Sequence, residues 1–350
     1  MESYNFDEDD MKNRGKTGLL NLGNTCYLNS ASQCLSHTTI LRDYFLKGTY
    51  KKYQNTKHKS SVLVDEWYDM LTRLWSTHLG VRPGSYVNNV QRISRESGDF
   101  AMFGGFSQND SQEYLGFYMN QLHDVLERKV KMTLTREAIT PIDKLYKKAC
   151  ENWITHFQNS YSIFTEIFYG QIINIIECPE TGEKSYNFDP QGMFPLSLPE
   201  YTDDNKLTLD KCFQYYTRHS VLDGDNAWMS EKANKKCKAY RYTRFWKLPK
   251  YLILILKRFD MNGQKRNDDI EYPEYFDIEK YTIVNEKKTN YRLYSVINHF
   301  GNVFGGHYIA HCRNHEQWRK FDDMQVEDVD ISNVLKQTKS AYVLFYELCE

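Results

Sequence analysis

The stretch Gly18-Leu19-Leu20-Asn21-Leu22-Gly23-Asn24-Thr25-Cys26-Tyr27-Leu28-Asn29-Ser30 reads as a short polar loop, hinged by glycines, that runs directly into a helix. Asn24 or Thr25 can cap that helix, because short polar side chains accept hydrogen bonds from the free N–H groups of a first turn. Cys26 therefore falls in the first turn. Apolar residues then recur at i, i+4 and i+8, which predicts one buried helical face: Tyr27, Ala31 and Leu35.

The position of Cys26 favours chemical reactivity. The helix dipole and the unpaired N–H groups of a first turn stabilise the thiolate, which is the form of cysteine that attacks carbonyl carbons. The alternative is an inert structural cysteine, because free cysteine is among the most buried residue types. Cys26 alone does not decide between the two, so the sequence around it and the rest of the chain must.

The composition fits a soluble globular protein with an ample core, because 41% of the 350 residues are hydrophobic and 26% are charged. The net charge of -1 provides no basic field for a nucleic acid or an anionic membrane. No apolar run approaches the ~20 residues of a membrane span, and the acidic N-terminus is unlike a signal peptide. Eight cysteines without a disulfide-framework spacing favour a reducing compartment.

The order of elements predicts an α+β architecture, with helices first and strands later. Residues 1–16 are polar and acidic and are expected to form a mobile leader. Helical spacing of apolar residues covers 62–79 and 110–128. The continuous apolar run 251–256 predicts a central strand buried on both faces. Further strands are expected at 167–176, 195–199, 293–297, 308–312 and 341–348.

Four separated motifs resemble those of the ubiquitin-specific proteases, in the same order. The opening stretch, followed by Gln33, resembles the cysteine box of that family almost residue for residue. Residues 108–115 resemble a second box, with Tyr114 where the family commonly has Phe. The third is Leu-Lys-Arg-Phe at 256–259, and the histidine box spans 298–308 and 318–323. The resemblance covers about Gly18 to Leu348.

The resemblance implies the catalytic roles. Cys26 is then the nucleophile and His307 the base that takes its proton. His299 and His311 are equally visible in the sequence, and only the Gly-Gly-His-Tyr context selects His307. Three further roles follow from the same motifs: Asp322 orients the imidazole, Asp323 shares or replaces that role, and Asn21 donates to the oxyanion.

The resemblance also implies how a ubiquitin tail, which carries arginines and ends in two glycines, is held. Carboxylates of Asp110 and Glu113 would face the arginines, while Gly305 and Gly306 would narrow the cleft at the scissile bond. An Asp at an N-cap with Glu three residues later is equally a capping pair that stabilises any helix, so both roles stay open. Two neighbours complete the expected substrate-binding set: Gln112 and Tyr308.

The implied fold is that of a papain-like cysteine protease with thumb, palm and fingers, forming one catalytic domain over 17–349. The thumb is expected at about 17–160, the fingers at about 165–250 between palm segments, and the palm at about 251–349. Many relatives carry zinc in the fingers, held by two Cys-x-x-Cys pairs. Here Cys178 is retained without its partner, and Ser230 and Ala233 stand where the second pair is expected. We therefore expect no metal and no cofactor.

The function implied is a deubiquitinating thiol protease that acts after the C-terminal glycine of ubiquitin. A catalytically silent ubiquitin-binding module is the first alternative, although such a protein would be expected to lack the Cys or His. A protease for a ubiquitin-like modifier is the second. The expected partners are ubiquitin and its conjugates, with no nucleic acid and no membrane. We expect a monomer in the cytoplasm or nucleus.

Overall fold

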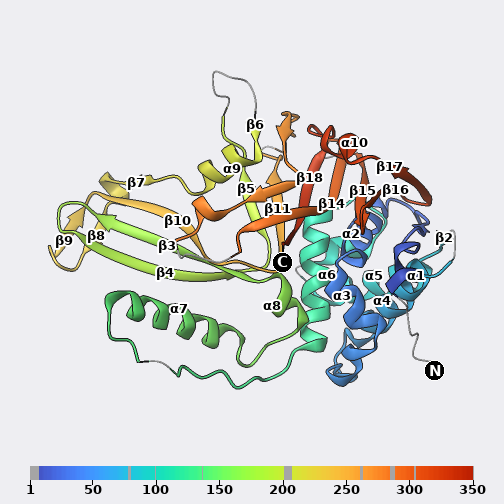
Figure 1. Cartoon of the computed structure of the whole chain (residues 1–350), viewed down its shortest axis with the longest axis horizontal. Coiled ribbons are helices and arrows are strands. Elements are labelled where there is room, and N and C mark those ends of the chain that lie inside the picture. Colours follow the sequence, from blue (N-terminus) through green and yellow to red (C-terminus); the bar gives the residue numbers. More distant parts are fainter. Residues whose placement is uncertain are drawn as a thin grey trace.

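Helices and strands gather in separate regions of the computed structural model (Figure 1), which confirms the predicted mixed fold class. The structure describes residues 8–77, 80–98, 100–135, 137–200, 207–260, 263–283, 288–302 and 305–349. A helical region and a large sheet lie against each other, and a smaller sheet projects from them. Among the described residues, no helix combines the length and apolar character needed to cross a bilayer.

The helical region corresponds to the expected thumb. It contains α2 (Cys26–Ser36), α3 (Thr39–Leu46), α4 (Ser61–Leu74), α5 (Gly84–Glu96) and α6 (Ser111–Leu126). Every residue of α2 is buried, because α2 lies between α6 and the large sheet. Tyr27 of α2 meets Tyr114 of α6 edge to face, with ring centroids 5.4 Å apart. The helix that begins at Cys26 is thus fixed on all sides.

The large sheet corresponds to the expected palm. Its strand order is β17 (Gln325–Val329), β16 (Gln317–Asp322), β15 (Gly306–Asn314), β14 (Asn290–Gly301), β18 (Ala341–Leu348), β11 (Tyr251–Lys257) and β5 (Phe194–Ser197), while β13 (Tyr275–Asp277) pairs with β14. All of β11 except Lys257 is buried. Ile253 and Ile255 face the thumb core, and the intervening leucines face a second core under α9 (Leu209–Tyr216), so the prediction of a strand buried on both faces is confirmed.

The projecting sheet corresponds to the expected fingers. Its strand order is β4 (Glu183–Gln191), β3 (Gly170–Cys178), β10 (Ala239–Lys247) and β7 (Ser220–Leu222), and the hairpin of β8 (Trp228–Ser230) and β9 (Lys235–Cys237) lies at its far end (Figure 1). Helix α7 (Pro141–Phe157) covers one face through a cluster of five buried residues: Ala149, Ile173, Ile175, Phe188 and Trp246.

The remaining elements are short. The helices are α1 (Glu8–Lys12), α8 (Ile163–Phe168) and α10 (Ile331–Leu335), with 3-10 turns at Thr49–Lys52, Ala101–Gly104, Gly224–Asn226 and Glu279–Tyr281. Parallel pairs join β1 (Gly18–Leu19) to β2 (Gly80–Val81) and β6 (Leu207–Thr208) to β12 (Ile270–Glu271).

Three segments pack differently from the expected division into leader, thumb and fingers, whose boundaries stay a prediction. Helix α7 packs on the fingers sheet, although 17–160 was expected to be thumb. Strand β5 and helix α9 belong to the palm sheet and its core, although they fall within 165–250. Part of the expected mobile leader is packed: Met11 is buried, and Asn314 Nδ2 donates to the carbonyls of Met11 and Arg14 at 2.9 and 3.0 Å. Residues 1–7 lie outside the described residues.

The end of the fingers is held by polar bonds at the positions where the sequence lacks the second cysteine pair. Ser230 Oγ donates to Glu183 at 2.6 Å and accepts from the N–H of Ala233 at 3.1 Å. Cys178 and Cys237 are buried free thiols nearby. Within the described part of the chain, the one group of three or more His, Cys, Asp or Glu spaced for a metal is far from the fingertip, at His307.

Protein purified without chelator should therefore contain well below one equivalent of zinc, because two sulfurs cannot close a tetrahedral structural site. Elemental analysis measures the zinc content directly. EDTA should leave the melting temperature unchanged, whereas Ser230→Ala should lower it by removing a buried hydrogen bond. Zinc near one equivalent, or a fall in melting temperature with EDTA, would show that the fingers hold a metal.

Candidate active site

Helix α2 begins at Cys26, as predicted. The expected side-chain cap at its N-terminus is not formed by Thr25. Thr25 occupies the N-cap position without bonding the first turn through its side chain. Its hydroxyl instead accepts from the N–H of Leu22 at 2.9 Å, which tightens the loop before the helix. Asn24 adopts a left-handed φ of 56°. The first-turn N–H groups beside Cys26 are therefore not taken by a capping side chain.

The surroundings of Cys26 nevertheless raise the pKa of its thiol. Burial raises its pKa and the nearby Asp323 carboxylate raises it further, while hydrogen bonds from the backbone of Tyr308 and Tyr27 act in the opposite direction. Burial thus outweighs the helix N-terminus that the sequence suggested would favour a thiolate. A base must remove the proton at the moment of attack.

The imidazole of His307 lies on the neighbouring strand β15. The backbone N–H of Tyr308, which acts on the Cys26 thiol, directly follows His307 at the start of β15. His307 Nε2 lies 2.6 Å from Asp322 Oδ1, at the end of the adjacent antiparallel strand β16. Because Asp322 holds Nε2, the other ring nitrogen of His307 is left to exchange a proton with a thiol.

The second carboxylate of this turn has different partners. Asp323 accepts from Asn29 Nδ2 at 2.7 Å and from Asn21 Nδ2 at 2.9 Å. Its carbonyl accepts from the N–H of Leu19 at 2.9 Å. Asp323 also has a left-handed φ of 51°, so its side chain leaves the strand in another direction from that of Asp322. Asp322 is therefore the partner of His307, and Asp323 positions the loop before Cys26.

The side-chain amide of Asn21 is held in place by hydrogen bonds that use only one of its two N–H hydrogens. Its Oδ1 accepts from the backbone N–H groups of Gly23 and Thr25 at 3.0 and 3.1 Å. Its Nδ2 donates to Asp323, and an amide nitrogen carries two hydrogens. The second hydrogen remains for another acceptor at the start of α2. This is the arrangement that an oxyanion donor requires.

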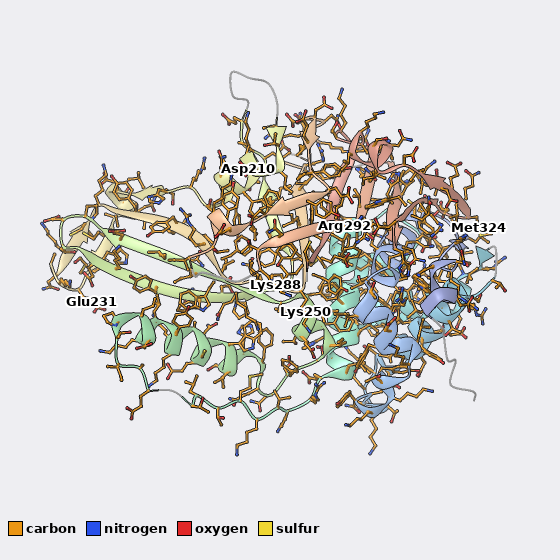
Figure 2. All side chains as sticks on the ribbon, in the orientation of Figure 1. Asp210, Glu231, Lys250, Lys288, Arg292 and Met324 are labelled. Atoms are coloured by element: carbon orange, nitrogen blue, oxygen red, sulfur yellow. The ribbon has the colours of Figure 1, made fainter. Side chains whose placement is uncertain are left out.

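The two boxes meet with no room for side chains between them. A Cβ on Gly18 would lie 2.5 Å from the carbonyl oxygen of Met324, the residue after Asp323. Figure 2 shows Met324 at the edge of the thumb, beside the end of β16 and far from the fingertip residue Glu231. The glycine at the start of the opening stretch is therefore needed for close approach of the two backbones.

A cavity of about 470 Å³ lies along the start of α6. Asp110, Gln112, Glu113 and Tyr308 line it, so four of the expected substrate-binding residues meet at one place. Asp110 is the N-cap and accepts from the N–H groups of Gln112 and Glu113, and Tyr342 donates to its other oxygen. No described residue bonds the Glu113 carboxylate, so the structure assigns the capping role to Asp110 and leaves Glu113 free.

The positions of Gly305 and Gly306, the two glycines before His307, differ from the expected position in the wall of the substrate cleft. Neither lines the cavity at α6. A Cβ on Gly306 would lie 2.3 Å from His299 Nε2, whereas a Cβ on Gly305 would meet nothing within 4 Å. Gly306 is thus required inside the β14–β15 hairpin itself, and a role of the pair in narrowing the cleft stays a prediction.

Sequence reasoning missed several positioning residues. Gln108 Oε1 accepts from the N–H of Gly306 at 2.6 Å and so ties the second box to the histidine hairpin. Asn29 holds Asp323, and Tyr342 holds Asp110. Gln108 and Asn29 stand inside the recognised motifs, which was a usable signal. Tyr342 comes from β18, and nothing in its local sequence indicates this contact.

The chain is similar to known proteins along almost its whole length. The family model described as ubiquitin carboxyl-terminal hydrolase matches residues 17–346. Ubiquitin carboxyl-terminal hydrolase 2 of Homo sapiens is 33% identical over 352 residues, which cover 96% of this chain and 55% of the relative. Ubiquitin carboxyl-terminal hydrolase Usp2 of Drosophila melanogaster is 30% identical over 346 residues, 97% of this chain and 35% of the relative. The chain spans about half or less of the length of these relatives.

Solved structures share the fold. The SAGA DUB module of Ubp8, Sgf11, Sus1 and Sgf73 bound to monoubiquitin contains a chain that matches with a TM-score of 0.77 and 24% identity, over 97% of this chain and 70% of that one. A second structure of the yeast module matches with a TM-score of 0.74 at the same identity, over 97% of this chain and 70% of that chain. At this level of identity the likeness shows the architecture alone.

Proposed function

This chain belongs to the ubiquitin carboxyl-terminal hydrolase family, and we propose that it is a thiol protease that cleaves isopeptide or peptide bonds after the C-terminal glycine of ubiquitin. The observation that carries the proposal is a chain of contacts around the thiol of Cys26. The backbone of Tyr308 hydrogen-bonds this thiol, and the preceding residue, His307, is held by Asp322 at 2.6 Å. The amide of Asn21, on the loop before α2, is fixed by Asp323 with one N–H left to donate.

The reaction proceeds in two halves. Cys26 Sγ attacks the carbonyl carbon of the terminal glycine while the free ring nitrogen of His307 takes the thiol proton. The tetrahedral intermediate collapses to a thioester, and His307 returns the proton to the departing amine. Water, deprotonated by His307, then attacks the thioester, and its collapse releases the free carboxylate and restores the thiol.

Two features lower the barrier for these steps. Asn21 and the N–H groups of the first turn of α2 are positioned to donate to the oxyanion of each tetrahedral intermediate, and such donors are worth about 3 kcal/mol in other enzymes. Asp322 keeps the imidazole in the tautomer that accepts from sulfur and stabilises its protonated form.

Ubiquitin is the partner that fits best. The titles of the SAGA structures name monoubiquitin as the bound protein, and we infer the same partner here. Glu113 at the cavity beside α6 would face an arginine of the ubiquitin tail. We further propose that the enzyme acts as a monomer in a reducing compartment, in line with its eight free cysteines.

Probes made of ubiquitin or ubiquitin-like proteins with a C-terminal thiol-reactive group test the proposal. The ubiquitin probe should label Cys26 covalently and much faster than any ubiquitin-like probe. Labelling of none of them would favour a silent binding module, although retention of both Cys26 and His307 argues against one. Faster labelling by a ubiquitin-like probe would assign the enzyme to that modifier.

Glu113→Arg should raise KM for ubiquitin substrates about tenfold or more, because it places like charges opposite the tail, and it should leave the melting temperature nearly unchanged. Steady-state kinetics measures the effect, and a substrate with the matching arginine changed to glutamate should recover part of the activity. Asn120→Arg, on an exposed face of the same helix, is the matched control. Unfolding of Glu113→Arg, or failure of every charge-swapped substrate, would remove Glu113 from tail recognition.

A further inference from the structure

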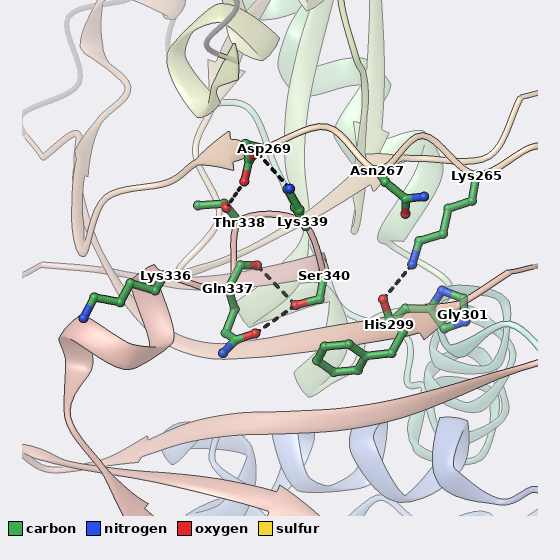
Figure 3. Close-up of a pocket in the computed structure, with 11 residues that line it drawn as sticks. Lys265, Asn267, Asp269, His299, Gly301, Lys336, Gln337, Thr338, Lys339 and Ser340 are labelled. Carbon is green, nitrogen blue, oxygen red and sulfur yellow. Dashed lines mark hydrogen bonds and ion pairs between the residues drawn. The ribbon is translucent and has the colours of Figure 1, made fainter.

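A second cavity, of about 480 Å³, lies on the palm and is separate from the tail cavity at α6. Three segments line it: 265–269, the end of β14 at 299–301, and the turn 336–340 between α10 and β18 (Figure 3). Only His299 lines both cavities. The proposed hydrolysis mechanism uses none of the polar groups that surround this second cavity.

The lining carries an excess of positive charge in a chain whose net charge is -1. Among the described residues, it contains the ammonium groups of Lys265, Lys336 and Lys339 and a single carboxylate, that of Asp269. His299 adds no charge at neutral pH, because burial and the nearby Lys265 lower its pKa to about 4. Three positive groups against one negative group leave an excess of two.

The one carboxylate is already engaged. Asp269 accepts from Thr338 Oγ1 at 2.6 Å and lies 3.6 Å from Lys339 Nζ (Figure 3). Lys336 forms no ion pair with any carboxylate in the described part of the chain. At least one ammonium group of the lining is therefore without a counter-charge from the protein.

Lys265 is the most constrained of the three lysines. Its Nζ donates to the carbonyl of His299 at 2.6 Å, which fixes the ammonium against the end of β14 (Figure 3). Burial lowers its pKa to about 8, and the charge of Arg258 contributes. A positive group in this setting lacks solvation, and an anion placed beside it would replace the missing water.

Neutral donors complete the lining. Gln337 Oε1 accepts from Ser340 Oγ, which leaves the amide N–H groups of Gln337 to donate. The Asn267 side chain projects beside that of Lys265 from the same segment (Figure 3). Amide donors among lysines suit an acceptor-only group with several oxygens, because each oxygen can receive more than one hydrogen bond.

We propose that this cavity is a binding site for a phosphate group, either free phosphate or the phosphate of a phosphorylated side chain. A phosphate dianion matches the excess of two positive charges, and its oxygens match the ammonium and amide donors. A single carboxylate would balance only half of that charge.

The position of the cavity links it to the catalytic strand. In the β14–β15 hairpin, Phe300 pairs with His307 and Gly301 pairs with Gly306. Phe300 and Gly301 are also part of the cavity lining. A bound phosphate would thus rest against the residues directly opposite the base. Binding itself does not depend on the proposed function, and only an effect on turnover would rest on it.

Calorimetric titration of the full chain with pyrophosphate, inorganic phosphate and a phosphoserine pentapeptide tests the site. Lys336→Gln combined with Lys339→Gln should weaken binding of the tightest probe about tenfold or more, because two of the three ammonium groups are lost. Lys57→Gln combined with Lys59→Gln, two exposed lysines of the thumb, should leave binding unchanged. Since all four lysines are exposed, both double variants should keep the melting temperature of the parent.

The probes distinguish the two sources of the phosphate group. Tighter binding of the phosphoserine peptide than of inorganic phosphate or pyrophosphate, with no binding of the unphosphorylated peptide, would assign the site to a phosphorylated side chain. The reverse order would assign it to the free anion. No binding of any probe at millimolar concentration, or equal binding by the Lys336→Gln/Lys339→Gln variant, would overturn the proposal. Such a result would leave the proposed hydrolase activity untouched, since ubiquitin hydrolysis is assayed separately.

Discussion

Replacing Cys26 with alanine should abolish hydrolysis of ubiquitin conjugates and leave ubiquitin binding nearly unchanged. In the proposed mechanism the thiol supplies the electron pair that forms the thioester, and alanine has no group that can replace it. Removing the nucleophile of a triad costs roughly 10⁵–10⁶ in kcat in other enzymes. The change deletes one buried sulfur from the contact surface, so the dissociation constant for ubiquitin should change little. Single-turnover hydrolysis and calorimetry measure the two effects.

Cys150→Ala is the matched control, because Cys150 is an exposed free thiol on α7 and lies outside the proposed site. It should retain full activity. Hydrolysis by a pure Cys26→Ala sample at more than a trace of the parental rate would exclude Cys26 as the nucleophile. A large loss of ubiquitin affinity would instead show that the alanine variant disturbs α2.

The parts of the fold that the sequence predicted are those fixed by local patterns. The continuous apolar run 251–256 removes its side chains from water on both faces when it forms an inner strand of a sheet. Strand β11 is that inner strand. The i, i+4 pattern after Cys26 predicts a helix with a buried face, and α2 begins at that residue. Such patterns depend on neighbouring residues alone, so they can be read without knowledge of the rest of the chain.

The features that the sequence did not predict depend on contacts between distant segments. Helix α7 has an ordinary amphipathic sequence, and nothing in it reveals that its partner is the fingers sheet. Met11 is held by Asn314, a residue some three hundred positions away. Spacing rules cannot predict partners of this kind, because such contacts join segments that are far apart in the sequence.

The candidate site also combines features that follow from the local sequence with features that depend on the assembled fold. The sequence places Cys26 in the first turn of a helix. From that position we predicted that the helix N-terminus stabilises the thiolate. The pKa of Cys26 is instead raised, because the surrounding palm and thumb residues bury it. Burial is a property of the assembled fold, and it outweighs the backbone hydrogen bonds that favour the thiolate of Cys26. This also explains why the site needs a base that is well oriented.

Asp322→Ala should lower kcat by about 10²–10⁴, because His307 loses the carboxylate that fixes its tautomer. Asp323→Ala should also impair hydrolysis, by about 10²-fold, but through Asn21, whose amide would lose the acceptor that orients it. Asp323→Ala should lower the melting temperature as well, because buried Asn29 would lose its shortest hydrogen bond. Asp330→Ala, at the start of α10, is the control for removal of a nearby carboxylate.

Alkylation of Cys26 by iodoacetamide separates the two roles, since it measures thiolate formation without using the oxyanion donor. Asp322→Ala should slow alkylation, because a poorly oriented imidazole accepts the thiol proton less well. Asp323→Ala should leave the rate unchanged or raise it. The Asp323 carboxylate raises the pKa of Cys26, so its removal lowers that pKa and increases the thiolate fraction at a given pH. If Asp323→Ala slows alkylation as much as Asp322→Ala does, Asp323 acts on His307 in solution, and the assignment of the two carboxylates must be exchanged.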